Sequence, residues 1–422
     1  MLAARSLKIG GVPYDHVEKN PDVGGIWDIR NDWTPMYASA HFISSKTMSH
    51  LPGYPMPDDY PDYPGHRLIF AYLQNFARDY GLYDGLDFGA EVVRADRDGA
   101  CWSVRFADGR VVRYRGLFVC SGNTWDPNLP DYPGMFSGEI IHSVRYDHAD
   151  QFRGKRVLVV GGGNSGCDIA CDAALAADSA LISLRRGYHF IPKYVLGMPA
   201  DVFAGKASLP LWLEQRLFGA LLRVLVGDLE SYGLPKPDHR VMESHPIMNT
   251  QILHHLGHGD LAVRPDIARL DGNTVHFTDG SSDQVDLIVY ATGYKVTYPF
   301  LDRAHFEWLG KYPDLYLSAL HREYDNLCCL GLHQTDGGAF DFFGMQADMM
   351  VNYIIDQDER PEHARRFEEQ KRSDRTLLRG GMRYVDSDRH RTYVKKAAFR
   401  AYCARIFKSF GWRQFGLMAS GS

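Results

Sequence analysis

The stretch Arg156-Val157-Leu158-Val159-Val160-Gly161-Gly162-Gly163-Asn164-Ser165-Gly166 decides the fold of this chain. Its first five residues form an apolar, β-branched run that predicts a buried parallel strand. A Gly-x-Gly-x-x-Gly loop follows, and residues 167–177 predict a helix. This context is typical of a dinucleotide site: Gly161 makes the turn, Gly163 lets the backbone reach the pyrophosphate, and Gly166 allows the helix to pack on the strand. The free N–H groups around Asn164 and Ser165 then bind phosphate.

The residues after the next strand select the nucleotide. Residues 180–184 predict that strand, and Arg185 and Arg186 follow it, nineteen and twenty residues after Gly166. An acidic residue here would bind the ribose hydroxyls of NAD, whereas two guanidinium groups favour a 2′-phosphate. We interpret this as an NADPH site. A solvated arginine pair is the alternative.

An earlier passage repeats the later part of this unit. Residues 12–17 predict a strand that ends at Glu18, and residues 116–120 predict a strand followed by Gly122, as residues 285–290 are followed by Thr292-Gly293. Hairpin turns lie between the strands of both passages, at Asp98-Gly99, Asp108-Gly109, Asp271-Gly272 and Asp279-Gly280. Gly122 and Gly293 are 171 residues apart, and Glu18 and Arg185 are 167 apart. The repeat predicts a second dinucleotide unit, in which Glu18 binds a ribose hydroxyl and FAD is the expected nucleotide.

The glycine loop of the first copy would fall just ahead of Met1. Residues 1–8, followed by Gly10-Gly11, predict the end of a helix with a glycine cap. We therefore expect an α/β fold with two Rossmann-like domains: an FAD-type domain of residues 1–150 and 295–422 whose first strand is missing, and an inserted NADP-type domain of residues 151–294. A truncated or mis-started reading frame is our hypothesis for the missing strand.

Composition excludes several other classes of protein. The chain has 422 residues, 45% of them apolar and 23% charged, and its 41 glycines exceed the average share. The net charge of −5 without long runs of one sign argues against a nucleic-acid partner. Seven cysteines without a CxxC pair argue against a disulfide framework and a zinc site, and favour a cytoplasmic setting without a bound metal.

The sequence contains neither a signal peptide nor an apolar run long enough for a transmembrane segment. The nearest candidate, residues 209–228, is interrupted by Glu214, Arg216 and Arg223. A helix packed on the core is the favoured interpretation of this segment. A surface helix touching a membrane, or a lid over a substrate cleft, are the alternatives.

At this point the chain resembles the flavin-containing monooxygenases, a group of class B flavoprotein monooxygenases that also include Baeyer–Villiger enzymes. The most specific match is Phe136-x-Gly138-x-x-x-His142-x-x-x-Tyr146, in which Baeyer–Villiger enzymes typically carry Trp at the last position. Further matches are Glu18-Lys19, Gly24-Gly25-Ile26-Trp27, Ser45-Lys46-x-Met48, Cys167-Asp168 after the glycine loop, and Ala291-Thr292-Gly293-Tyr294.

The resemblance implies FAD in the discontinuous domain and NADPH in the inserted one. Reduced flavin would react with O2 to give a C4a-hydroperoxyflavin, which would transfer one oxygen atom to an amine nitrogen or a sulfide sulfur. Because the cofactor carries this chemistry, no side chain is assigned as catalytic. The expected partners are O2 and a small molecule: an amine, a sulfide or, for a Baeyer–Villiger enzyme, a ketone. The oligomeric state stays open.

The resemblance also implies residue roles. On the FAD side these residues are Glu18, Gly24, Gly25, Ile26, Trp27, Ser44, Ser45, Gly122, Thr292, Gly293 and Gln346. On the NADP side they are Gly161, Gly163, Asn164, Ser165, Gly166, Arg185 and Arg186. His142 either approaches the pyrophosphate or holds the linker between the domains, and we favour the second role. Ile43 departs from the family, in which an asparagine stabilises the oxygenated flavin.

Two alternatives to N- or S-oxygenation follow from these residues. A Baeyer–Villiger monooxygenase is disfavoured by Tyr146. A non-catalytic NADP(H)-binding protein that no longer holds FAD would fit a chain without the first glycine loop.

Overall fold

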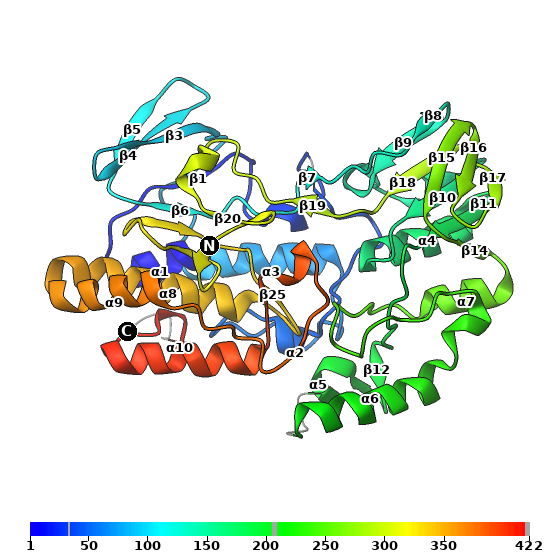
Figure 1. Cartoon of the computed structure of the whole chain (residues 1–422). Coiled ribbons are helices and arrows are strands. Elements are labelled where there is room, and N and C mark those ends of the chain that lie inside the picture. The colour runs from blue at the N-terminus through cyan, green and yellow to red at the C-terminus, as the bar shows by residue number, and fades with distance from the viewer. Residues whose placement is uncertain (33, 205–208, 418–422) are drawn as a thin grey trace.

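The computed structural model describes every residue except 33, 205–208 and 418–422. The chain forms two α/β units that lie side by side (Figure 1). Two connections cross between them, where β7 (Asp126–Pro127) pairs antiparallel with β19 (Tyr294–Lys295). Residues on both sides of the 127–294 segment therefore belong to the first unit.

The second unit is built on the predicted strand, glycine loop and helix. Strand β10 (Arg156–Val160) is central in a parallel sheet of order β14-β11-β10-β18-β9. The other strands are β14 (Leu261–Arg264), β11 (Ser179–Ser183), β18 (Leu287–Tyr290) and β9 (Glu139–His142). Val157 and Val159 pack toward helix α4 (Asn164–Ala176). Leu158 and Val160 pack toward a second sheet, so β10 is buried on both faces, as its continuous apolar run predicts.

The second sheet has the order β17-β16-β15-β8. Its strands are β17 (Ser282–Gln284), β16 (Thr274–Phe277), β15 (Ile267–Gly272) and β8 (Gly134–Phe136), and the two predicted hairpin turns connect β15 to β16 and β16 to β17. Strands β8 and β9 both precede residue 150. Strand pairing thus places residues 134–142 in the second unit, ahead of the expected domain limit at 150, because β9 extends the parallel sheet beside β18.

The first unit follows the same element order. Helix α1 (Leu2–Gly10) ends at Gly11, whose φ of 71° is the left-handed cap predicted from the glycine pair. It is followed by β1 (His16–Glu18), β2 (Leu86–Phe88), the antiparallel sheet of β3 (Val92–Asp98), β4 (Cys101–Phe106) and β5 (Val111–Tyr114), and then β6 (Leu117–Val119). This order parallels α4, β11, β14, β15, β16, β17 and β18 of the second unit, which is the arrangement expected of a duplicated fold.

The parallel between the units stops at one position. In the second unit β10 lies between β11 and β18. In the first unit β1 pairs only with β2, while β6 is the edge of a separate sheet of order β22-β23-β24-β6. Among the described residues no strand lies between β1 and β6. The α-amino group of Met1 interacts electrostatically with Glu18 and Cys120, the residues at the ends of these two edges.

Helices and short strands complete the molecule. In the first unit these are α2 (Lys46–Ser49), α3 (His66–Asp79), α8 (Phe340–Glu359), α9 (Pro361–Ser373), α10 (Lys396–Phe410), β20 (Trp308–Leu309), β21 (Tyr312–Pro313), β22 (Leu315–Tyr316), β23 (Leu320–His321), β24 (Leu327–Cys329), β25 (Gln334–Thr335) and β26 (Tyr393–Val394). In the second unit they are β12 (Tyr194–Val195), β13 (Met198–Pro199), α5 (Ala200–Ala204), α6 (Leu211–Val226) and α7 (Gln251–His258). No helix in the described part of the chain is both long enough and apolar enough to cross a bilayer.

Candidate functional site

The glycine loop between β10 and α4 has the geometry of a phosphate-binding turn. Gly161 has a φ of 117°, a conformation that side chains rarely adopt. A Cβ on Gly166 would lie 2.0 Å from the carbonyl oxygen of Gly161, so this glycine lets helix and strand approach each other. Gly163 is different, because a Cβ there would meet nothing within 4 Å. Gly163 is the N-cap residue of α4, and no side chain of the described residues caps the start of this helix.

The start of α4 is held in place by Asn164. Its Nδ2 donates to the carbonyl oxygen of Pro246 (3.2 Å), and its Oδ1 accepts from the N–H of Met248 (2.8 Å). The Asn164 side chain therefore fastens the loop before α7 to the helix, and the backbone N–H groups of residues 164–166 remain the predicted phosphate donors. Sequence reasoning did not separate these two roles, because the partners of the side chain lie more than eighty residues away.

The arginine pair lies at the end of β11, as predicted. Arg185 is exposed, whereas Arg186 is half-buried and donates from Nη2 to Asp238 Oδ1 at 2.7 Å. Hydrogen bonds from the side chains of Arg186 and His239 lower the pKa of Asp238 to about 2. The buried Nε of Arg186 has no hydrogen-bond partner among the described residues. Asp238 was not predicted, since nothing in its local sequence marks it as a partner of Arg186.

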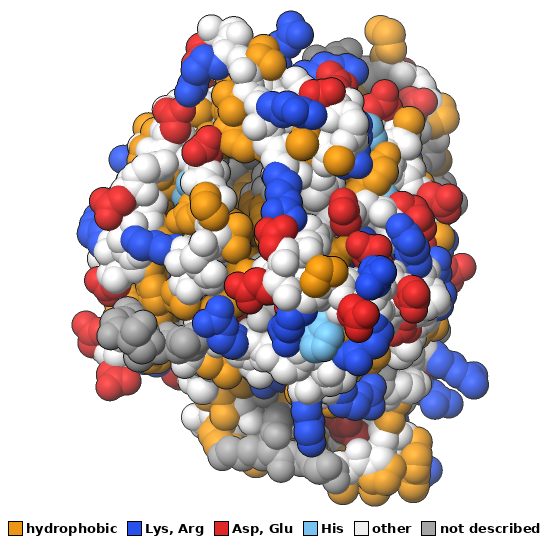
Figure 2. Space-filling view, turned by 90° about the vertical axis from the view of Figure 1, so that its left-hand side faces the viewer, with side chains coloured by type: hydrophobic (Ala, Val, Ile, Leu, Met, Phe, Trp, Pro, Cys, Tyr) orange, Lys and Arg blue, Asp and Glu red, His pale blue; other side chains and the backbone are white. Residues whose placement is uncertain are grey.

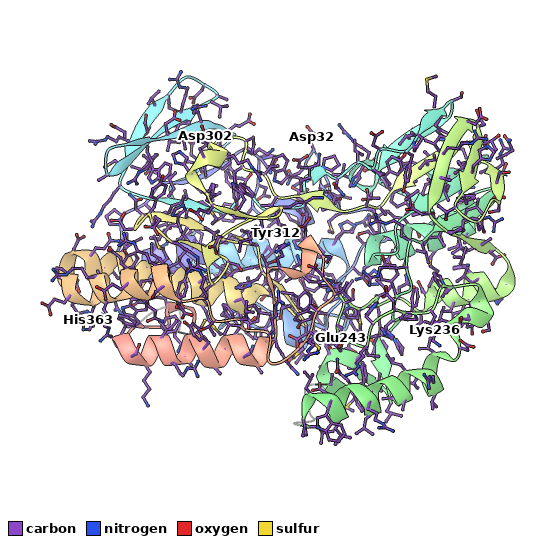
Figure 3. All side chains as sticks on the ribbon, in the orientation of Figure 1. Asp32, Lys236, Glu243, Asp302, Tyr312 and His363 are labelled. Atoms are coloured by element: carbon purple, nitrogen blue, oxygen red, sulfur yellow. The ribbon has the colours of Figure 1, made fainter. Side chains whose placement is uncertain are left out.

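A long loop brings Asp238 to this position. The residues around Lys236 pass so close to Gly187 that a Cβ on this glycine would lie 2.3 Å from the Lys236 backbone. The loop then runs toward the first unit, as the labelled side chains of Lys236 and Glu243 show (Figure 3). There the Glu243 carbonyl accepts from the N–H of Val385 at 2.8 Å. One continuous segment thus contacts both Arg186 and the first unit.

His142 lies at the crossing between the units, where both of its ring nitrogens bond to backbone groups. Its Nε2 donates to the carbonyl oxygen of Gly293 (3.0 Å), and its Nδ1 accepts from the N–H of Val144 (3.2 Å). Burial lowers the pKa of His142, and this neutral ring matches the donor and acceptor roles of its two nitrogens. Thr292 Oγ1 donates to the carbonyl of Asn128, and the carbonyl of Gly293 accepts from the N–H of Asn128. Thr292 and Gly293 therefore tie the two crossing strands together.

On the FAD side, Glu18 ends β1 and is half-buried. Its Oε1 accepts from both the N–H and the Nδ2 of Asn20, each at 2.9 Å. Gly24 follows with a φ of 115°, and a Cβ there would lie 2.6 Å from the Phe70 ring. Gly25 begins a short 3₁₀ turn that ends at Trp27. This turn presents backbone close to the end of β1, which is the position predicted for a flavin nucleotide.

The segment around Ile43, the residue that replaces the family asparagine, is held in place by hydrogen bonds of Ser44 and Ser45. Ser44 and Ser49 share a hydrogen bond of 2.6 Å between their hydroxyl oxygens. The N–H of Ser45 donates to Asp201 of the second unit at 2.7 Å, while the buried Ser45 hydroxyl has no hydrogen-bond partner. Ile43 is half-buried. An isoleucine side chain offers no hydrogen bond, so Ser45 is the polar side chain that this segment leaves available.

Gln346 is a second buried polar group with an unused atom. Its side chain is 1% exposed, its Nε2 donates to the Leu317 carbonyl at 2.6 Å, and its Oε1 has no partner. Leu317 and Ser318 have φ values of 51° and 52°, which are strained for residues with side chains. Gln346 therefore holds this turn through its Nε2, while its Oε1 has no hydrogen-bond partner among the described residues.

A polar seam joins the two units beside the start of α4. The Tyr37 hydroxyl donates to Asp168 (3.0 Å), Ser39 donates to Asp172 (2.7 Å), and the Lys193 ammonium contacts the ring of His41. Burial raises the pKa of Asp168 and lowers that of Lys193, since both charges are withdrawn from water. Sequence analysis missed this seam because its partners are more than a hundred residues apart.

These residues fit a dinucleotide in the second unit more completely than in the first. The open space at Gly163, the uncapped start of α4 and the exposed Arg185 that follows β11 together suit a nucleotide with phosphate groups. In the first unit Glu18 and Gly24 suit a ribose and a flavin edge, but the described residues offer no glycine loop for the FAD pyrophosphate. Within the described ranges, no three His, Cys, Asp or Glu side chains come together as a metal site requires.

Several known proteins are similar in sequence to this chain. The probable indole-3-pyruvate monooxygenase YUCCA9 of Arabidopsis thaliana is 32% identical over 315 residues, which are 71% of this chain and 73% of the relative. The N-oxide-forming dimethylaniline monooxygenase 2 of Rattus norvegicus is 29% identical over 361 residues, covering 78% of this chain and 66% of the relative.

Solved structures share the fold at lower identity. A steroid monooxygenase bound to NADP superimposes with a TM-score of 0.69 at 19% identity, covering 98% of this chain and 96% of that one. The S-allyl-L-cysteine S-oxygenase of Allium sativum gives a TM-score of 0.66 at 18% identity, over 98% of this chain and 86% of that one. Both support the two-unit Rossmann-type architecture. The sequence model of the flavin-binding monooxygenase-like family (FMO-like) matches residues 11–398. The chain therefore belongs to this family of flavin-dependent monooxygenases.

Proposed function

We propose that this protein is an NADPH- and FAD-dependent monooxygenase that inserts one oxygen atom from O2 into an amine nitrogen or a sulfide sulfur of a small molecule. The family supplies the reaction class. The observation that carries the nucleotide choice is the position of Arg185 and Arg186 beside the open glycine loop at the end of β11. The flavin supplies the oxygen chemistry when it is bound.

The proposal assigns roles to this chain's own residues. Gly163 and the N–H groups of residues 164–166 bind the NADP pyrophosphate, while Arg185 and Arg186 bind the 2′-phosphate. Glu18 binds the ribose of FAD, while Gly24, Gly25 and Trp27 place backbone and an aromatic ring near the flavin, with Ile26 and Gly122 also on the FAD side. Ser44, Ser45 and Gln346 face the flavin, and His142, Thr292 and Gly293 hold the crossing that sets one unit against the other.

The described residues include no glycine loop that would bind the FAD pyrophosphate. We infer that FAD binding requires a strand with a glycine loop between β1 and β6, because the second unit has β10 at the equivalent position. A protein that binds NADP(H) without catalysis is the corresponding alternative.

The substrate class has a second candidate. Relatives named indole-3-pyruvate monooxygenases are 32% and 31% identical to this chain. A 2-oxo acid is therefore a substrate to test beside a tertiary amine and a sulfide. A ketone belongs in the same panel, since structural neighbours include cyclohexanone monooxygenase. A cytoplasmic location is part of the proposal, and the oligomeric state is left to measurement.

The test is reconstitution of the purified chain with FAD, followed by NADPH oxidation with each substrate under labelled dioxygen. The proposal expects yellow protein, NADPH oxidation that substrate accelerates, and one labelled oxygen atom in an N-oxide or sulfoxide. An ester from the ketone would instead identify a Baeyer–Villiger enzyme, and a decarboxylated acid from indole-3-pyruvate would identify the second candidate. Colourless protein that still binds NADPH would contradict every oxygenase assignment for the chain as it stands.

A further inference from the structure

Helix α6 (Leu211–Val226) presents an apolar face to solvent. Of its sixteen residues only Leu222 is buried, in a small cluster with Val195 and Val241. The side chains of Trp212 and Val224 are 63% and 83% exposed. Leu217 and Leu225 are also exposed, at 52% and 42%. Single exposed apolar residues are ordinary, but several large ones on one helix mark an interaction surface.

The helical period places Trp212, Leu217 and Val224 on one side, whereas Leu225 lies about 80° beyond them. At 100° per residue, the residues within one arc of about 140° are Trp212, Leu213, Arg216, Leu217, Ala220, Arg223 and Val224. All of them are exposed except Leu213, which is half-buried. The opposite side carries Leu222 and also Gln215, which donates to the Val241 carbonyl at 3.1 Å. We call the residues of this arc, which runs around the helix from Trp212 to Leu217, the α6 face.

The charges of the α6 face are all positive. Arg216 and Arg223 are exposed within it. The acid of the helix, Glu214, lies outside the arc and is half-buried, with its Oε2 3.3 Å from Lys395 Nζ. Over the face of the molecule in Figure 2, acidic and basic side chains alternate, with hydrophobic side chains between them.

We propose that the α6 face docks on an anionic lipid surface, with the helix lying in the plane of the interface. Tryptophan and leucine on one face with arginine beside them are the composition of interfacial helices, and arginine is attracted to acidic lipid headgroups. A second copy of the chain fits less well, because a two-fold contact through this face would bring the arginines of both copies together. The docking is peripheral and adds to the oxygenase function without depending on it.

The test is co-sedimentation of the full chain with vesicles of phosphatidylcholine alone or with phosphatidylglycerol added, at low and at high salt. The chain is expected to bind only the anionic vesicles and to be released by salt. Trp212 fluorescence should be quenched by brominated lipid, and Trp212→Phe should remove most of that quenching. Equal binding to both vesicle types, or binding to neither, would overturn the proposal.

Matched variants separate the α6 face from general surface effects. Arg216→Gln with Arg223→Gln should weaken binding roughly twentyfold, at about fivefold per arginine. Arg105→Gln with Arg383→Gln removes the same charge from other exposed positions and should change binding by less than about twofold. Val224→Ser should weaken binding, whereas Leu377→Ser, at a residue 73% exposed, should not. Concentration-dependent dimers that Val224→Ser abolishes, without vesicle binding, would assign the face to a second copy and contradict the lipid proposal.

Discussion

Gly166 packs directly against Gly161: a Cβ on Gly166 would lie 2.0 Å from the Gly161 carbonyl oxygen. We expect Gly166→Ala to lower the free energy of unfolding by at least about 1–3 kcal/mol, because helix α4 must move away from β10. Gly163→Ala should change it by less than about 1 kcal/mol, since its φ of −74° suits any residue and the space beside it is open. Denaturant unfolding of the two variants measures the difference.

The variants Gly166→Ala and Gly163→Ala also separate an effect on folding from an effect on NADPH binding. Gly163→Ala should fold normally yet bind NADPH at least about tenfold more weakly, because the added methyl group occupies the space that the pyrophosphate needs. Titration of NADPH fluorescence measures this affinity. Unchanged NADPH binding by folded Gly163→Ala would rule out the pyrophosphate position.

The arginine pair provides a test of nucleotide choice. Replacing Arg185 and Arg186 by Ala should weaken NADPH binding at least about tenfold and leave NADH within about threefold, since the lost charge-assisted hydrogen bonds involve only the 2′-phosphate. Arg105→Ala, at an exposed arginine on β4, serves as the control for net charge. Equal losses of affinity for NADPH and NADH would show that the two arginines do not bind the 2′-phosphate.

Sequence patterns predicted the local parts of this structure well. The strand at residues 156–160, the helix after Gly166 and the cap at Gly11 all depend on neighbours within a few residues. The pairing of Arg186 with Asp238 and the seam between Tyr37 and Asp168 were not predicted, because such partners are chosen by the packing of distant segments. Position in the sheet was also beyond local patterns, as the pairing of β9 with β18 shows.

Acid should destabilise the fold partly through His321. Burial lowers the pKa of this side chain to about 4, and its ring is neutral, with Nε2 donating to the His305 carbonyl and Nδ1 accepting from the N–H of Tyr324. The unfolded chain takes up a proton near pH 6.5 but the folded chain does not. Stability is therefore full above about pH 6.5 and falls as the pH is lowered to about 4, by up to about 1.4 kcal/mol per pH unit.

Urea unfolding measured from pH 7.5 to 4 tests this sign. His321→Asn should be less stable at pH 7.5, because hydrogen bonds are lost, and should show a shallower decline on acidification. His258→Asn, at a side chain that is 70% exposed, is the matched control and should keep the original slope. A decline of the same steepness in His321→Asn would mean that other groups cause the acid sensitivity.

The gap between β1 and β6 predicts that a strand supplied there will improve FAD binding. The offset of 167 residues between Glu18 and Arg185 relates the two units. A copy of residues 155–167 joined directly ahead of Met1 would therefore place a strand and a glycine loop where the second unit has β10 and Gly161–Gly166. The α-amino group of Met1 interacts electrostatically with Glu18 and Cys120, which lie at the ends of β1 and β6. The added segment would therefore enter between β1 and β6.

The extended chain should bind FAD at least about tenfold more tightly than the original chain, because the loop adds N–H donors for the pyrophosphate. FAD titration by flavin fluorescence quenching, with both chains measured in parallel, gives the ratio. The matched control carries the same extension with only the glycine that corresponds to Gly163 replaced by alanine; it should supply the strand but leave less room for the phosphate, and so should lose most of the gain. If the original chain binds FAD as tightly as the extended one, the first unit holds the nucleotide without a strand at this position and the comparison with β10 does not apply to FAD.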